Sequence, residues 1–218
     1  MTEQKTKKNE FVEIKYSGYA NNQLFDSNIP SDLAKINADA KPHKTIIVIG
    51  QNMVVAGLDK ALEEKELNKQ YEVSIPPREG FGRRRRELVQ IIPLASFIEQ
   101  KIDPHPGMML TLDNHLVKIL VVSGARVTVD FNNPLAGKDL YYKFTIVRKV
   151  TDEKEKIESL CDYFFHITPE IEIREANIVI RGQKNLGPFI NLFKEKFKDL
   201  LHKEIIFEEK NIEEKTQQ

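Results

Sequence analysis

The sequence predicts an α+β protein with a main domain, an inserted β-rich module and a C-terminal α/β domain. Three observations support this. Residues 46–82 have the pattern of a strand, a short helix, a second strand and a Gly-punctuated loop. Residues 83–133 contain short strand-like runs separated by turn residues. After residue 151, apolar spacing changes to the order helix, strand, strand, helix, strand.

These changes of pattern suggest domain boundaries. We assign the main domain to 10–82 and 134–150, the inserted module to 83–133 and the C-terminal αββαβ domain to 151–210. The polar ends, residues 1–9 and 211–218, are expected to be flexible.

Composition narrows the possible functions. Among 218 residues, 40% are hydrophobic, which is enough for packed cores, and the 33 Lys+Arg equal the 33 Asp+Glu. A neutral chain argues against nucleic-acid binding. The single cysteine, Cys161, excludes an intrachain disulfide, and no apolar run approaches the roughly 20 residues of a membrane helix. We therefore expect a cytoplasmic protein that contacts no membrane.

The first segments of the main domain show strand periodicity. Residues 11–16 place Val12, Ile14 and Tyr16 on one face, and a turn at Asn21-Asn22 leads to a second short strand at 24–26. Residues 27–44 resemble a loop with one helical turn at 32–36.

The stretch 46–82 organises the rest of the main domain. The apolar run 46–49 stops at Gly50, and Leu58, Ala61 and Leu62 then have helical spacing. Residues 71–75 alternate as a half-buried strand that Pro76-Pro77 terminates. The alternating run 140–150 resumes the same sheet after the insert.

Five segments with a familiar order carry a family resemblance: EIKYSGY, LFDSN, VIGQNMVVAGLDKAL, EVSIPPREGFG and NNPLAGKDLYYKFTIVRKV. Together, over roughly residues 10–150, they resemble the FKBP-type peptidyl-prolyl cis-trans isomerases. The likeness is greatest to the SlyD-like and long archaeal branch, in which an insert-in-flap chaperone domain interrupts the isomerase domain. Residues 83–133 stand where that branch has its insertion.

The resemblance implies a bent antiparallel sheet around one short helix, and a cofactor-free and metal-free pocket for proline. Leu58 would form its floor, the backbone N–H of Val55 would bind a substrate carbonyl, and Ile49 would lie nearby. The implied pocket residues are Tyr16, Phe25, Asp26, Val54, Val55, Leu58, Phe81 and Tyr142.

Three departures from the family pattern affect this expectation. Leu58 stands where many small members have Trp, and Phe81 where Tyr is usual, so the pocket would be less rigid and would lack one hydroxyl. Asn133-Pro134 alters the return hinge. These changes bear on macrolide binding and activity and leave the fold expectation intact.

The expected clients are unfolded or nascent polypeptides with exposed X–Pro bonds, held by the insert. Apolar side chains of the insert, two of them methionines, would form an exposed groove that adapts to varied client sequences. The alternative, which is preferred for most of them, is that the same side chains form the core of the module. The residues concerned are Phe97, Ile98, Met108, Met109, Leu110 and Leu112.

Other interpretations remain open. A non-catalytic holdase or adaptor would keep the fold with a weakened pocket, and the pocket aromatics would then be core residues. The run Arg83–Arg86 suits either RNA or a solvated hinge at the insert. The C-terminal domain could be a dimerisation module, a second client-binding surface or a minimal RNA-binding fold, and self-association as a homodimer is the preferred interpretation. Five scattered histidines show no metal-ligand spacing.

Overall fold

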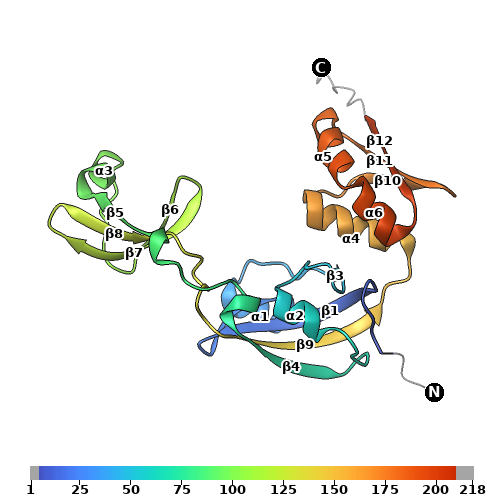
Figure 1. Cartoon of the computed structure of the whole chain (residues 1–218), viewed down its shortest axis with the longest axis horizontal. Helices are drawn as coiled ribbons and strands as arrows, with labels where there is room; N and C mark the ends of the chain where they lie inside the picture. The colour runs from blue at the N-terminus through green and yellow to red at the C-terminus, as the bar shows by residue number, and fades with distance from the viewer. Residues whose placement is uncertain (1–4, 210–218) are drawn as a thin grey trace.

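The computed structural model describes residues 5–209, and the predicted flexible tail at 211–218 lies outside them. The protein has a mixed α/β fold whose main sheet is antiparallel (Figure 1). A central domain carries the insert on one side and the C-terminal domain on the other (Figure 1). No helix among the described residues is long and apolar enough to cross a membrane.

Strand β1 (Phe11–Ala20) is the strand with the most partners in the central sheet, whose order is β2-β1-β9-β4. Strand β9 (Leu140–Lys149) pairs along one edge of β1. On the other edge, β2 (Gln23–Ser27) pairs with the C-terminal half of β1, and β3 (Thr45–Val48) with its N-terminal half. Register shifts after Glu13 and after Gly18 mark irregularities in the pairing of β1.

The predicted strands and turn of this domain are confirmed. Val12 and Ile14 are buried, and Asn21 and Asn22 both have positive φ in the β1–β2 turn, as a tight hairpin turn with a matching twist requires. The helical turn predicted at 32–36 is α1 (Pro30–Ile36), and the predicted strand 71–75 is β4 (Gln70–Ile75).

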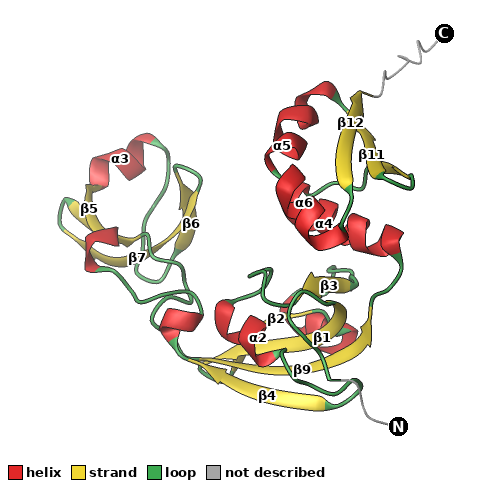
Figure 2. Cartoon of the chain, turned by 45° about the vertical axis from the view of Figure 1, so that its right-hand side comes forward, coloured by secondary structure: helices red, strands yellow, loops and turns green. Residues whose placement is uncertain are grey.

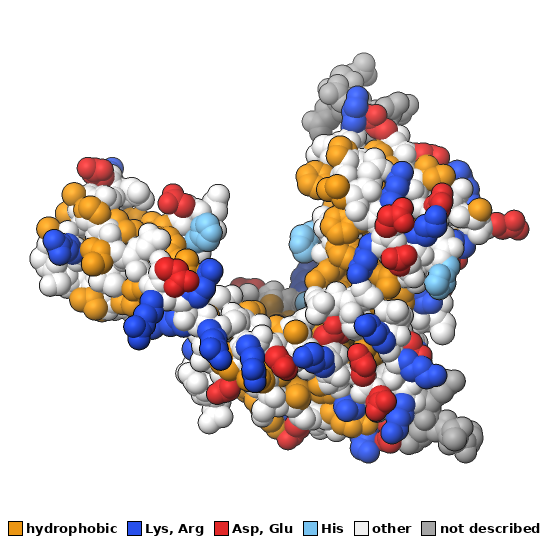
Figure 3. Space-filling view, in the orientation of Figure 1, with side chains coloured by type: hydrophobic (Ala, Val, Ile, Leu, Met, Phe, Trp, Pro, Cys, Tyr) orange, Lys and Arg blue, Asp and Glu red, His pale blue; other side chains and the backbone are white. Residues whose placement is uncertain are grey.

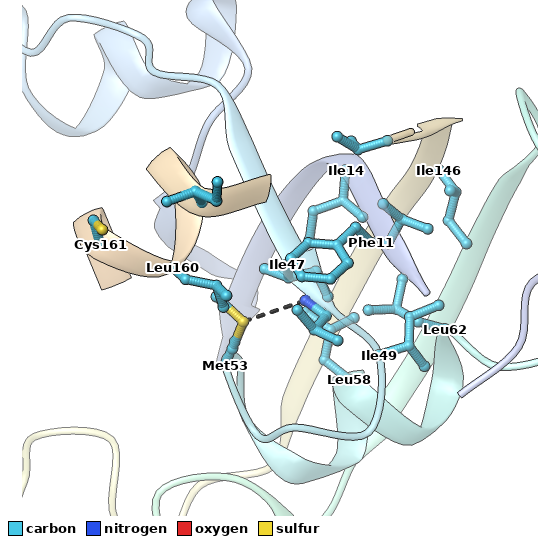
Figure 4. Packing of buried hydrophobic residues seen from close by; sticks show 14 of the residues in the cluster. Phe11, Ile14, Ile47, Ile49, Met53, Leu58, Leu62, Ile146, Leu160 and Cys161 are labelled. Carbon is cyan, nitrogen blue, oxygen red and sulfur yellow. Dashed lines mark hydrogen bonds between the residues drawn. The ribbon is translucent and has the colours of Figure 1, made fainter. Parts of the chain in front are cut away.

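Helix α2 (Ala56–Ala61) packs against the sheet through a glycine. A Cβ on Gly57 would lie 2.5 Å from Cγ2 of Ile75 in β4, so only glycine allows this close approach. Leu58 in this helix and Leu62 directly after it are buried in the core. Figure 4 shows these side chains with Phe11, Ile49 and Ile146.

The insert forms its own four-stranded antiparallel sheet, in the order β5-β8-β7-β6. The η1 turn (Pro77–Glu79) and η2 turn (Arg86–Leu88) precede it. Period-two burial of Val117, Ile119, Val127 and Val129 creates a core against Phe97. Its elements are β5 (Val89–Pro93), α3 (Leu94–Glu99), β6 (Met109–Leu112), β7 (His115–Ser123) and β8 (Arg126–Asp130).

Two polar side chains hold the two connections of the insert together. Arg84 donates from Nε and Nη2 to Oδ2 of Asp130, at 3.0 and 2.7 Å. Asn132 accepts from the backbone N–H of Arg85 at 2.8 Å and donates to its carbonyl at 2.9 Å. Part of the arginine run 83–86 therefore joins the segment that enters the insert to the segment that leaves it.

The C-terminal domain has a three-stranded sheet in the order β10-β11-β12, with helices on one face (Figure 2). Strands β10 and β11 are antiparallel, and β11 and β12 are parallel. The elements are α4 (Glu153–Phe165), β10 (Glu170–Ile173), β11 (Asn177–Gly182), η3 (Lys184–Leu186), α5 (Gly187–Leu192), α6 (Lys194–Leu201) and β12 (Glu204–Glu209).

One prediction for this domain was wrong in detail. The single amphipathic helix expected after Pro188 is two helices that meet at Phe193, whose φ of −102° and ψ of 4° interrupt the helical path. Ile190 of α5 and Phe197 of α6 are both fully buried. The apolar spacing continues across the break, so periodicity alone did not reveal it.

Helix α4 links the C-terminal domain to the central core. Its Leu160 and Cys161 are fully buried in the hydrophobic cluster that also contains Ile47 and Met53 (Figure 4). Asp152 caps the helix by accepting from the Glu155 N–H at 2.8 Å. The C-terminal domain is thus packed directly on the central domain.

Candidate active site

Four aromatic rings from separate segments meet beside α2. The ring centroid of Phe25 lies 5.8 Å from that of Tyr142 and 6.1 Å from that of Phe81, both edge to face. The Tyr16 and Tyr142 centroids are 6.1 Å apart. These separations suit favourable aromatic packing. The four rings predicted from sequence are therefore brought together.

A glycine in β1 makes room for two of these rings. Gly18 pairs with Asp26 on one side and Tyr142 on the other. A Cβ at this position would lie 2.7 Å from Cε1 of Tyr142 and 3.0 Å from Cζ of Phe25. The rings occupy the space that any other residue would fill.

Asp26 supplies a carboxylate beside the rings. The Tyr16 hydroxyl donates to its Oδ2 at 3.0 Å. Burial, followed by the Asp26 charge and this hydrogen bond, raises the pKa of Tyr16 well above its usual value. Tyr142 also has a raised pKa, first from burial and then from Asp26. Both phenols therefore keep their protons to a higher pH than an ordinary tyrosine does.

A buried asparagine that the sequence reasoning missed holds Tyr16 in place. Asn28 accepts from the Tyr16 backbone N–H at 2.9 Å and donates to the Ile14 carbonyl at 2.8 Å. It replaces strand pairing where β2 has ended. Its position in a predicted loop gave no sign of a partner twelve residues earlier.

The loop before α2 carries Val54 and Val55, which pack against the central core, and Val54 lines a cleft together with Tyr16. The Val55 carbonyl accepts from the N–H groups of Leu58 and Asp59, at 2.9 and 3.0 Å, and so begins the helix. Within residues 5–209, no acceptor is found for the Val55 N–H. That donor is available for a ligand carbonyl, as the family resemblance implies.

Asp59, also missed from sequence, fixes this loop from within the helix. Its carboxylate is 3% exposed and accepts from the N–H groups of Gly50 and Asn52, both at 2.8 Å. Leu58 beside it is 1% exposed, and Ile49 is fully buried. Leu58 and Ile49 therefore lie in the core next to the site rather than on its open surface.

The loop that holds Phe81 is tied to the chain returning from the insert. The Gly82 N–H donates to the Pro77 carbonyl at 2.7 Å, and the Gly137 N–H donates to the Gly82 carbonyl at 2.8 Å. The second of these bonds connects the Phe81 loop to the chain that returns from the insert.

The six predicted client-binding residues of the insert divide into buried and exposed groups. Phe97 is 2% exposed and belongs to the module's core, and Met108, Leu110 and Leu112 pack against it half-buried. Ile98 and Met109 are 62% and 47% exposed. Hydrophobic side chains gather on the visible face of this module (Figure 3), and Ile91, Leu116 and Val121 are also exposed.

A cleft of about 460 Å³ adjoins the aromatic site and was not predicted from sequence. It lies between the central domain and α4, and its lining includes Tyr16 and Val54. No cluster of metal-ligating side chains occurs in the described part of the chain.

Comparison with known proteins gives two matching families. Residues 2–98 match the family model "FKBP-type peptidyl-prolyl cis-trans isomerase", and residues 90–135 match "FKBP26, IF domain".

Curated relatives give the same result. Over 150 residues the chain is 33% identical to the "Short-type peptidyl-prolyl cis-trans isomerase" of Methanocaldococcus jannaschii, covering 67% of this chain and 92% of the relative. It is 30% identical to the "FKBP-type peptidyl-prolyl cis-trans isomerase SlyD" of Helicobacter pylori over 57% of this chain and 69% of the relative. The chain is also 37% identical to SlyD of Haemophilus influenzae, over 45% of this chain and 53% of the relative.

Proposed function

This chain belongs to the FKBP-type peptidyl-prolyl cis-trans isomerases, and on that premise we propose that the aromatic site isomerises X–Pro bonds in client chains that the insert holds. The clients are unfolded or partly folded polypeptides with exposed prolines. The observation that carries the proposal is the meeting of Tyr16, Phe25, Phe81 and Tyr142 around a single carboxylate.

Such a site can act without a nucleophile or a metal. Amide resonance gives X–Pro rotation a barrier of about 18–20 kcal/mol and places partial charges on the amide oxygen and nitrogen. The twisted state has less charge separation, so apolar walls disfavour the planar amide relative to it. Each tenfold in rate needs about 1.4 kcal/mol of such differential binding.

The polar groups at the rim position the peptide. No described residue accepts from the Val55 N–H, so this group can donate to a client carbonyl. Asp26, which accepts from Tyr16, is held beside the rings and anchors and polarises the bound amide rather than removing a proton. These groups fix one carbonyl while the prolyl ring turns among the aromatic rings.

Peptide titration and catalysis test this assignment together. Adding a short X–Pro peptide should shift the amide resonances of Gly18 and Val55, and Tyr142→Ala should abolish most catalysed exchange. Tyr141→Ala is the matched control, because Tyr141 packs on Tyr19 and lies outside the aromatic site. Equal losses in both variants would refute the assignment.

The exposed apolar residues of the insert support its role in client binding. Replacing Ile98 and Met109 by Ser should reduce suppression of aggregation of an unfolded protein while short-peptide isomerisation persists. Ile173→Ser, which removes a 37% exposed side chain in the C-terminal domain, is the control. Full suppression by the insert variant would exclude these residues as the client surface.

The C-terminal domain presents a surface suited to the proposed homodimer. Phe189 and Leu192 on α5 are 59% and 79% exposed, an unusual state for large apolar side chains. Sedimentation should give a dimeric mass for the full chain and a monomeric mass for the Phe189→Ser/Leu192→Ser double variant. An unchanged mass would exclude this surface.

A further inference from the structure

The cleft beside the aromatic site has two walls that come from different domains. Tyr16, Thr45 and Val54 line it from the central domain, and Glu158 and Asp162 line it from α4. Because Tyr16 and Val54 also belong to the proline site, a peptide leaving that site in this direction enters the cleft. Its volume of about 460 Å³ is enough for a few residues of extended chain.

Polar contacts hold the α4 wall in a fixed position. The Tyr163 hydroxyl donates to the Asn52 carbonyl at 3.1 Å, which connects α4 to the loop that carries Val54. Lys44 Nζ donates to Glu155 at 2.7 Å. The buried Leu160 of the same helix packs beside Met53 of the central domain (Figure 4). The cleft is therefore formed before a client arrives.

The charges along this wall are not balanced. Glu155 is neutralised by Lys44 and by Arg148, whose Nη2 donates at 2.8 Å. Glu158 has only an exposed ion pair with Lys154 at 3.8 Å, and no described side chain pairs with Asp162. His43 and His166 also line the cleft. Glu158 and Asp162 are one helical turn apart, so their carboxylates lie on the same face of α4.

The floor between the walls suits an extended peptide. Ile46, Ile47 and Met53 provide apolar surface for aliphatic side-chain stems. The Thr45 hydroxyl oxygen is buried and has no hydrogen-bond partner within residues 5–209. An apolar floor with acidic groups on one side matches lysine or arginine, whose stem is apolar and whose end is cationic.

We propose that this cleft is an extension of the client-binding site, in which α4 contacts residues that flank the prolyl bond and favours a basic side chain at one of them. Glu158 and Asp162 attract the cation, and the apolar floor contacts the stem. The inference rests on the proposed function of the aromatic site. It assigns the C-terminal domain a direct part in client selection.

Isomerisation of a peptide series by the full-length protein tests the proposal. The peptides contain one X–Pro bond, with Lys or Glu placed in turn at each neighbouring position. We expect kcat/KM to be about threefold to tenfold higher for Lys than for Glu, and only at positions on one side of the proline. Higher salt should weaken the preference, since exposed charges are screened.

Two variants identify the wall responsible. Glu158→Lys/Asp162→Lys should abolish or reverse the preference and leave the rate for a neutral peptide unchanged. Glu175→Lys, a single Glu-to-Lys charge reversal in the exposed β10–β11 turn away from the cleft, should preserve the preference. Absence of any charge preference in the wild type, or its persistence in the double variant, would overturn the proposal.

Amide resonances of α4 report occupancy of the cleft separately from catalysis. Titration of a Lys-containing peptide should shift Asp162 and Tyr163 in the wild type and not in the double variant. If α4 responds but the neutral peptide is not isomerised, the proposed function fails and the cleft assignment stands. If isomerisation occurs without any α4 response, the cleft assignment fails alone.

Discussion

The Tyr16 hydroxyl donates a 3.0 Å hydrogen bond to the Asp26 carboxylate, joining β1 to β2 at the rim of the aromatic site. Asn28 holds the Tyr16 backbone from the residues that follow β2. The Asp26 carboxylate, the Tyr16 phenol and the Phe25 ring are thereby placed by the pairing of two strands.

Tyr16→Phe removes the hydroxyl and keeps the ring, so it tests the contribution of this bond. We expect kcat/KM for a short X–Pro peptide to fall about threefold to tenfold, because Asp26 loses a charge-assisted partner. NMR exchange spectroscopy measures the rate. Tyr19→Phe serves as the control, since its ring packs on Tyr141; an unchanged rate in Tyr16→Phe would contradict the expectation.

The raised pKa values of Tyr16 and Tyr142 predict a loss of stability at high pH. Both phenols keep their protons in the folded protein where unfolded tyrosines ionise, near pH 10. Their contribution is complete below about pH 10 and declines as pH rises toward the folded pKa. Urea unfolding across this range should show a shallower decline in the free energy of unfolding for Tyr16→Phe than for the wild type. Parallel curves for the two proteins would contradict this prediction.

Gly18→Ala would place a methyl group where the rings lie. The 2.7 Å approach to Tyr142 requires the ring to move, and we expect a loss of about 1–3 kcal/mol in the free energy of unfolding, with reduced isomerisation. Gly124→Asn in the β7–β8 turn is the control, because a Cβ there meets nothing within 4 Å and Asn tolerates positive φ. A Gly18→Ala variant with wild-type stability would show that the Tyr142 ring can move aside without cost and would contradict the expectation.

Asn132→Ala would break the link between the two insert connections. The side chain is 7% exposed and bonds both the N–H and the carbonyl of Arg85, so we expect a loss of about 1–3 kcal/mol and faster hydrogen exchange at Arg85.

Asn133→Ala provides a close comparison for this change. Asn133 makes a single exposed bond to the Leu135 N–H, so its loss should cost much less. Equal hydrogen exchange at Arg85 in both variants would rule out the proposed link.

Periodicity predicted most of the central domain because its strands bury one face. Val12 and Ile14 in β1, and Tyr142, Phe144 and Ile146 in β9, alternate as expected and are all buried. The four aromatic rings were identified by family resemblance and not by spacing, since each alone is an ordinary core residue.

What the sequence did not reveal depends on contacts between distant residues. Asn28 and Asp59 resemble turn and helix-start residues, yet each satisfies backbone groups in other segments. For Phe97 the sequence left client contact and core packing both open, and the fold of the insert buries the side chain. The cleft arises from the packing of α4 on the central domain, which no local pattern describes.

The most direct test of the central claim is the catalysed cis–trans exchange of a short X–Pro peptide, measured for the wild type beside Tyr16→Ala and Asp26→Ala. The account predicts clear acceleration by the wild type and a deep loss in both variants while their folds remain intact. Wild-type activity that survives both substitutions would place the chemistry outside the aromatic site. No acceleration by the wild type would favour a holdase that keeps this fold without catalysis.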